Sequence, residues 1–418
     1  MIRAGVARLD ITPPVGAFMS GFGARNAPAS ATHDPLSVRA IALNDTAMVV
    51  ADVIGMCAQM CARIRARCIL PDQNVIVAAL HTHGGPISMS ERLGVDADQD
   101  YLDKLEDACV QVIDDAVLAQ KEASISVGAG EDPDIARNRR VENGPVDSSL
   151  PVMKIRDKSG KIIAIMLAYA CHPVVLGADN RQWTADYPHF VRAALERAHP
   201  GAMALFITGC AGDANHGHSA YESLSLASDN RRSFTKAREV GEQIAKMALL
   251  APETEISGDI KAHNKIVSLE FERREADAPK VLMDRWIREK NSAKNNANDA
   301  RRALLDHWIR WAQEIAPQPV RPIKARVTIL EWAGVSIIGL PGEIFAQTGL
   351  DIRTAYKKDM PLFIAGFAED NPGYIPARSA YLTGGYEVDE AHRFYGQPAT
   401  FAPGSAETLA ACAISLLE

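Results

Sequence analysis

The sequence predicts an α/β fold with a mixed central sheet flanked by helices and a helical-hairpin insertion. Short apolar runs typical of buried strands recur along the chain. Segments with apolar residues at helical spacing lie between many of these runs, an alternation typical of α/β proteins. A charged, alanine-rich stretch late in the chain breaks the alternation and predicts the insertion.

The expected strands span residues 47–53, 74–79, 123–127, 162–168, 203–207 and 335–340, and the expected helices span 101–119, 186–198 and 237–250. The insertion covers residues 270–316, within a single domain that spans residues 1–418. Its apolar positions predict two antiparallel helices, joined near Asn296 and packed on the main body. Its tryptophans favour core contacts, with a flap over an active site as the alternative.

Composition excludes several classes of partner. The 418 residues are 47% hydrophobic and 23% charged, as in an ordinary globular chain, and the net charge is −7. Basic residues are scattered apart from Arg137, Arg139 and Arg140, which argues against nucleic-acid binding and stable membrane association. No long apolar run or secretory signal is visible, so we expect a cytoplasmic protein. The seven irregularly spaced cysteines predict reduced, mostly buried thiols, and the sequence is compatible with a homo-oligomer.

Two segments carry an apolar strand directly into histidine. In AALHTHGGP, alternation along an extended chain places the imidazoles of His81 and His83 on one side, which is half of a zinc site. In YACHPVVLG, His172 follows a strand in the same way. The first pattern alone is about as typical of surface or hydrogen-bonded histidines as of a metal site, and a lone histidine such as His172 is more often structural than a ligand. Together the two patterns indicate one shared sheet rim.

Three further segments carry polar groups. In IIGLPGEIFAQTG, Glu343 follows a strand and a Pro-Gly turn, where a helix dipole alone also favours a carboxylate. The loop FITGCAGDANHGH contributes Asp213 and Asn215, and its small residues allow close backbone approach. The segment NPGYIPARSAYLTGGYE holds tyrosines that suit a pocket, a metal or an oxyanion, or aromatics at a subunit contact. These are Tyr374, Tyr381 and Tyr386.

Together the five motifs resemble the catalytic domain of the neutral, non-lysosomal ceramidases, in the same order. The segments AGVARLDITPP and HDPLSVRAIAL resemble that family's opening strands, so the resemblance runs from Ala4 to about Pro403. It implies that zinc is held by His81, His172, Glu343 and Tyr374. It also places His83, Tyr386 and Arg139 in the substrate pocket.

Two departures from the family shape the expected chemistry. This chain reads GDAN where the ceramidases read GDVSPN, so that Asn215 replaces a serine discussed as a nucleophile. The secretory signal and the carboxy-terminal sandwich domain of the ceramidases are not seen in this sequence. We therefore expect a small soluble substrate rather than long-chain ceramide.

The resemblance implies a zinc-dependent hydrolase that cleaves an N-acyl or cyclic amide with zinc-activated water. Tyr386 or the amides of residues 209–213 would share the tetrahedral charge, His83 would relay a proton, and Arg139 would hold a carboxylate or hydroxyl of the substrate. A zinc-dependent lactonase or esterase, and a non-catalytic zinc- or ligand-binding relative, remain open at this stage.

Overall fold

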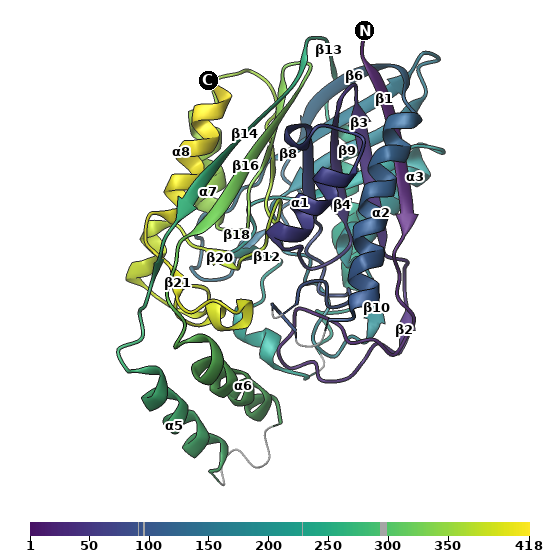
Figure 1. Ribbon diagram of the computed structural model, residues 1–418. Helices are drawn as coiled ribbons and strands as arrows, with labels where there is room; N and C mark the ends of the chain where they lie inside the picture. The colour runs from purple at the N-terminus through teal and green to yellow at the C-terminus, as the bar shows by residue number, and fades with distance from the viewer. Residues whose placement is uncertain (91, 95–96, 228, 293–298) are drawn as a thin grey trace.

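The computed structural model describes residues 1–90, 92–94, 97–227, 229–292 and 299–418, in which two stacked β-sheets lie between layers of helices (Figure 1). Helices α1 (Ala58–Arg67), α2 (Gln99–Leu118), α3 (Tyr187–Ala198) and α4 (Phe234–Leu250) cover the larger sheet. Helices α7 (Ala346–Ala355) and α8 (Ser405–Leu417) cover the smaller one. The predicted mixed sheet flanked by helices is confirmed; the second stacked sheet is an addition to that prediction.

The larger sheet is mixed and has the order β11-β9-β8-β6-β1-β3-β4-β5, with β13 also paired to β6. Only β11 with β9 and β4 with β5 pair in parallel along this path. Its strands are β1 (Arg3–Asp10), β3 (Ser37–Leu43), β4 (Thr46–Ala51), β5 (Val75–Ala79), β6 (Lys121–Gly130), β8 (Leu150–Asp157), β9 (Ile162–Tyr169), β11 (Met203–Thr208) and β13 (Thr254–Ile256).

Side-chain alternation in this sheet divides two cores. On β3, Ile41 and Leu43 enter the core shared with the second sheet, whereas Ala40 and Ala42 enter the core under α1 and α2. This period of two is what a strand covered on both faces requires. All six expected strands and all three expected helices are present, with ends shifted by at most a few residues.

The smaller sheet has the order β14-β16-β17-β19. Its strands are β14 (Ile260–Leu269), β16 (Ile323–Trp332), β17 (Val335–Gly339) and β19 (Phe363–Ala365). Short two-stranded pairs complete the fold: β2 (Ala31–Thr32) with β10 (Gln182–Trp183), β7 (Arg137–Asn138) with β12 (Ala214–Asn215), β15 (Phe271–Glu272) with β21 (Thr400–Phe401), and β18 (Glu343–Ile344) with β20 (Tyr374–Ile375).

The segment 366–369, just after β19, joins the two edge strands of the larger sheet. The amide of Gly366 donates to the carbonyl of Thr208 at the end of β11, over 3.0 Å. The amide of Ala79 on β5 donates to the carbonyl of Phe367, also over 3.0 Å. The amide of Glu369 donates to the carbonyl of Val77, likewise on β5, over 2.8 Å. The ends of β5 and β11, at opposite edges of the strand order, are thereby drawn together.

The insertion forms the two expected helices, α5 (Pro279–Lys290) and α6 (Asp299–Arg310). A short π-helical turn over Trp311–Ile315 follows α6. The expected junction near Asn296 lies outside the described residues. Trp286, Trp308 and Trp311 are buried in one cluster, and the guanidinium of Arg393 lies 4.9–5.3 Å from their ring centroids. The expectation of core contacts for these tryptophans is confirmed.

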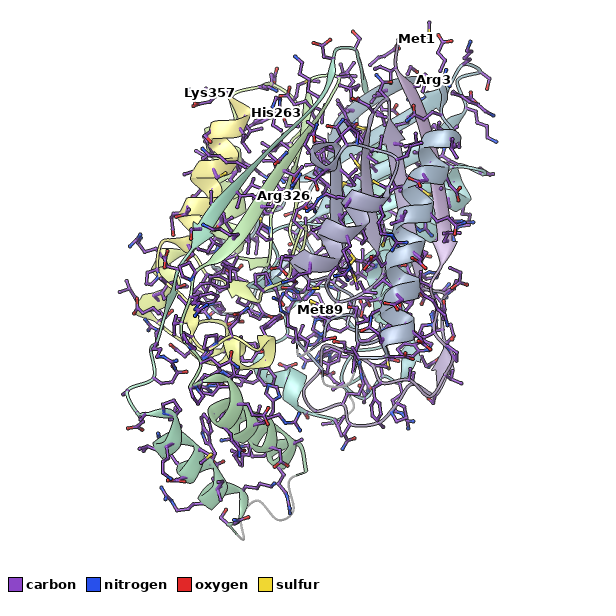
Figure 2. The ribbon with its side chains drawn as sticks, in the orientation of Figure 1. Met1, Arg3, Met89, His263, Arg326 and Lys357 are labelled. Atoms are coloured by element: carbon purple, nitrogen blue, oxygen red, sulfur yellow. The ribbon has the colours of Figure 1, made fainter. Side chains whose placement is uncertain are left out.

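Both chain ends lie at the end of the molecule opposite the α5–α6 hairpin (Figure 1). Met1 and Arg3 mark that end, whereas Met89 lies among the loops at the hairpin end (Figure 2). In the described part of the chain, no helix has the length and apolar character needed to cross a membrane. All seven cysteines are free thiols, and all but the half-buried Cys57 are buried.

Candidate metal centre and active-site cavity

Strand ends from both sheets deliver the candidate ligands. His81 follows β5 and His172 follows β9 in the larger sheet, whereas Glu343 follows β17 of the smaller sheet. All three side chains are fully buried. Buried charge and buried imidazole nitrogens require partners, so the convergence of these groups is itself a sign of a functional site.

The tautomers of the two histidines follow from their backbone partners. His81 Nδ1 lies 2.6 Å from the carbonyl of Ile54, and His172 Nδ1 lies 2.6 Å from the carbonyl of Ala211. A carbonyl only accepts, so each Nδ1 carries the proton and each Nε2 presents a lone pair. Burial lowers the pKa of His172 to about 4, which keeps its imidazole neutral at pH 7.

These lone pairs meet at one point. The two Nε2 atoms are 3.0 Å apart, and Glu343 Oε2 lies 3.1 Å from that of His172 and 3.4 Å from that of His81. Three acceptors at such distances repel one another unless a cation lies between them. Ligands about 2.0–2.1 Å from a tetrahedral zinc ion lie about 3.3 Å apart, so the donor set and its spacing fit zinc.

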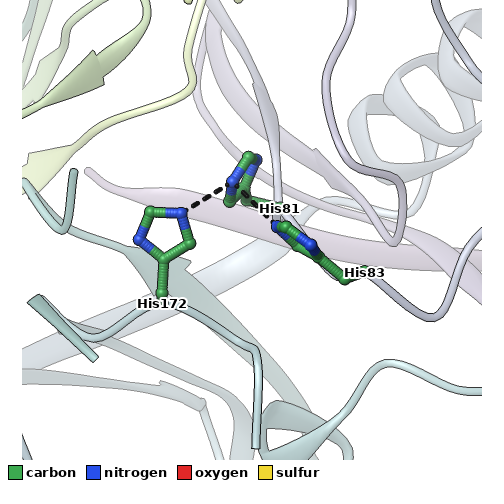
Figure 3. A group of neighbouring side chains, drawn as sticks. All are labelled: His81, His83 and His172. Atoms are coloured by element: carbon green, nitrogen blue, oxygen red, sulfur yellow. Dashed lines mark hydrogen bonds between the residues drawn. The ribbon is translucent and has the colours of Figure 1, made fainter. Parts of the chain in front are cut away.

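His83 extends the same cluster (Figure 3). Its Nε2 lies 3.4 Å from that of His81, and the three histidines could together hold a metal ion. Its Nδ1 is buried without a hydrogen-bond partner, and its ring packs on Phe22 at 4.8 Å. Burial, followed by the adjacent imidazoles, lowers the pKa of His83 well below its usual value.

The backbone reaches this arrangement differently from the extended chain expected. Strand β5 ends at Ala79, and His81 has φ 67°, in the left-handed region that non-glycine residues rarely occupy. The expected alternation of His81 and His83 along a strand is therefore wrong. The two rings converge because the chain turns at His81, where Phe367 stacks on its imidazole at 4.0 Å.

Glu343 and Tyr374 are partners in the parallel pair β18–β20. The second oxygen of Glu343 accepts a hydrogen bond from the hydroxyl of Tyr395. The hydroxyl of Tyr374 accepts from Arg139 Nη2 at 2.9 Å, and Arg139 Nε donates to Glu387 Oε1 at 2.9 Å. The expected pocket arginine is thus already bound to two buried acceptors.

The expected loop residues Asp213 and Asn215 hold neighbouring loops in place through hydrogen bonds. Asp213 accepts from the amide of Ala346 at 2.7 Å and from Asn138 at 2.9 Å, and burial raises its pKa to about 6. The side chain of Asn215 closes the turn to His218, accepting from that residue's amide at 2.9 Å and donating to its carbonyl at 2.8 Å.

Two expected oxyanion donors are occupied elsewhere. The amides of Gly209 and Gly212 donate to the carbonyls of Tyr169 and Ile344, at 3.1 and 2.8 Å. A Cβ on Gly212 would lie 2.4 Å from the carbonyl oxygen of Glu343, so the small residue serves close packing there. The expectation that these two amides receive the tetrahedral charge is wrong.

A cavity of about 490 Å³ opens beside the centre. Among the predicted site residues, it is lined by His83, Arg139, Asn215, Tyr374 and Tyr386. Its apolar walls come from Phe22, Ile87, Val174, Leu304 and Phe394. Of these, Leu304 lies on α6. The hairpin therefore contributes a wall of the cavity as well as a core of its own. Such a mostly apolar pocket with a few convergent polar groups suits a small organic ligand.

Sequence reasoning missed several contributors. Tyr395 and Glu387 bind predicted residues directly, and Phe367 stacks on His81. Tyr381, grouped with the pocket tyrosines, instead donates to the carbonyl of Phe401 at 2.7 Å. A late tyrosine or glutamate carries no local pattern that marks it, so only the packed loops identify these residues.

Comparisons with known proteins give the fold a counterpart. No known family profile matches the sequence, and no curated protein matches it. A solved structure of neutral ceramidase from Pseudomonas aeruginosa superposes with a TM-score of 0.74 at 16% identity, over 100% of this chain and 74% of that one. A structure described as ceramidase complexed with C2 also superposes with a TM-score of 0.74 at 16% identity, over 99% of this chain and 75% of that one. The predicted resemblance is confirmed for the fold.

Proposed function

We propose that this chain, which has the fold of the neutral ceramidases, is a zinc-dependent hydrolase that cleaves an amide bond of a small acyl compound. The observation that carries the proposal is the convergence of His81, His172 and Glu343 beside the 490 Å³ cavity. The two imidazoles and the carboxylate are the ligand types of catalytic zinc sites, which leave a position open for chemistry.

His81, His172 and Glu343 would hold the ion, and Tyr374 is the proposed fourth ligand; because zinc can also accept a fifth ligand, water would still have a place. When bound, zinc supplies a Lewis acid for a carbonyl group and lowers the pKa of a water molecule. Burial raises the pKa of Tyr374, and the guanidinium of Arg139 opposes that rise. Arg139 thus favours the phenolate and is proposed to position Tyr374.

The remaining cavity residues handle protons and charge. His83 is neutral because burial lowers its pKa, and its Nε2, which lies 3.4 Å from that of His81, faces the centre, where it would accept a proton from water and pass it to the leaving nitrogen. Burial raises the pKa of Tyr386, so its hydroxyl stays protonated and can donate to the developing oxyanion. Asn215 offers no nucleophile, so direct attack by water is the proposed route.

The test combines metal analysis with a matched set of substrates. Protein purified without chelator should contain about one zinc per chain and hydrolyse an amide such as N-octanoylglycine. Removing the metal should abolish the rate, and adding zinc should restore it. Hydrolysis confined to the corresponding octanoyl ester or to a lactone would move the assignment to an esterase or lactonase. Bound zinc with no turnover of any substrate would indicate a binding protein.

A further inference from the structure

We propose that the substrate carries a carboxylate, which Arg25 and Arg232 bind at the cavity wall beside His83. This inference rests on the proposed amide hydrolysis and assigns its substrate class. An N-acyl amino acid combines the three features that the site calls for: a scissile amide, an apolar acyl group and an anion.

The two arginines meet at one aromatic ring of the cavity. The guanidinium carbon of Arg25 lies 4.8 Å from the centroid of Phe22, and that of Arg232 lies 5.5 Å from it. The ring of Phe22 in turn contacts His83 at 4.8 Å. All four residues line the same cavity. Phe22 therefore lies between the two positive charges and His83, which is next to the proposed metal centre.

Neither arginine has a carboxylate within ion-pair distance in the described part of the chain. Arg25 is buried and donates only to backbone carbonyls, those of Ser20, His83, Gly177 and Ala178. Arg232 donates to the carbonyls of Val174 and Leu176 at 3.3 and 2.8 Å, and its buried Nε has no partner. Burial lowers the pKa of Arg25 to about 9 and also lowers that of Arg232.

Within the described ranges, the protein's own acids act on these guanidinium groups only from beyond ion-pair distance: Asp179 acts on Arg25, and Asp186, Glu222, Asp179 and Asp229 act on Arg232. Asp186, whose charge acts on Arg232 from beyond ion-pair distance, accepts the amides of Val175, Leu176 and Tyr187. Among the described residues that line the cavity, Asp306 is the only acid, and it pairs with Lys290. A desolvated guanidinium with no carboxylate in direct contact is costly, and a substrate carboxylate would reduce that cost.

The chemistry of the guanidinium favours a carboxylate over a neutral polar group. The planar fork forms paired, charge-assisted hydrogen bonds with a carboxylate, and the hydrogen bonds of Arg232 to the carbonyls of Val174 and Leu176 both come from its Nη2. A neutral amide in the same place leaves the cation unpaired. Because charged hydrogen bonds contribute more than neutral ones, we expect a preference of about 10- to 100-fold for the anionic substrate.

N-Octanoylglycine and N-octanoylglycinamide form a matched pair that differs only at this group. The wild-type zinc protein should hydrolyse the carboxylate with a kcat/KM about 10- to 100-fold higher than the carboxamide. The Arg232→Gln variant should lose most of this preference by slowing only the carboxylate, and Arg232→Lys should recover part of it. Arg231→Gln is the control, because Arg231 pairs with Asp229 and does not line the cavity.

Binding of the same two compounds, measured by titration calorimetry, gives a readout independent of turnover. Equal rates and equal binding for both compounds, or an unchanged preference in Arg232→Gln that melts like wild type, would overturn the carboxylate assignment while leaving amide hydrolysis in place. Tighter binding of the carboxylate that depends on Arg232, with hydrolysis of neither compound, would support the subsite and count against the proposed hydrolase.

Discussion

Glu343 and Tyr374 lie side by side as register partners of β18 and β20, although they follow different strands of the smaller sheet, β17 and β19. Their pairing places a buried carboxylate and a buried phenol at the same edge as the two histidines of the larger sheet. The amide of Glu343 also donates to the carbonyl of Gly373 at 3.0 Å, so the backbone holds the two segments in register. Tests of the centre can therefore separate ligands from the residues that position them.

Replacing His172 with alanine should remove metal binding. The variant loses one of three converging acceptors, so we expect zinc affinity to fall by at least about 100-fold and activity to disappear with it. Metal content after dialysis and a zinc titration measure this loss. His263→Ala is the control, because His263 is exposed on β14 and far from the loops of the site (Figure 2). Full zinc loading of His172→Ala would contradict the ligand set.

Tyr395→Phe tests a positioning residue. The hydroxyl of Tyr395 donates to the Glu343 oxygen that faces away from the histidines, and losing it should weaken zinc binding about 10- to 100-fold without unfolding the protein. Tyr381→Phe removes a comparable hydroxyl that donates to the carbonyl of Phe401. That variant should lose about 1 kcal/mol of stability and keep its zinc affinity. Equal zinc affinities in the two variants would mean that Tyr395 does not position Glu343 for metal binding.

Glu387→Gln should destabilise the fold strongly. Glu387 is buried and accepts from both Arg139 and Arg140, so its neutral replacement leaves two buried guanidinium groups without a carboxylate. We expect a loss of about 3–5 kcal/mol in the free energy of unfolding, measured by urea denaturation. The partly exposed pair of Glu331 with Lys358 provides the contrast, and Glu331→Gln should cost less than about 1 kcal/mol.

Glu253 should make stability depend on pH in acid. Burial alone would raise its pKa, but hydrogen bonds from Lys154, Ser126 and Arg156 lower the pKa to about 2. A carboxylate whose pKa is lower in the folded than in the unfolded state stabilises the fold above its ordinary pKa. That contribution is lost as the pH falls from about 4.5 towards about 2. Since solvent reaches a third of the side chain and screens the charges, we expect about 1 kcal/mol at pH 7.

The measurement is the difference in unfolding free energy between wild type and Glu253→Gln at several pH values. The difference should shrink steadily between pH 5 and pH 3. Glu239→Gln, at an exposed pair with Lys236, should differ from wild type by less than about 0.5 kcal/mol throughout. A Glu253→Gln difference that is constant with pH would mean that ionisation of this carboxylate does not stabilise the fold.

Local patterns were sufficient to predict the elements and to mark the polar groups at their ends. Apolar runs located the strands, and histidine or glutamate after a strand end marked His81, His172 and Glu343. The placement of these groups at strand ends is confirmed, because a buried strand and its polar end are written within a few consecutive residues. The tryptophan spacing of the insertion identified α5 and α6 for the same reason.

The geometry of the site was decided by contacts between distant segments. Segment 366–369 draws β5 towards β11, the turn at His81 aims two imidazoles at one point, and Tyr395 secures Glu343. The arginines at Phe22 likewise meet only after two remote loops pack together. The sequence by itself determined which groups stand at strand ends, because periodicity and turn chemistry are local. Only the tertiary structure decided which of them meet, because hydrogen bonds and burial between remote loops leave no repeating pattern in the chain.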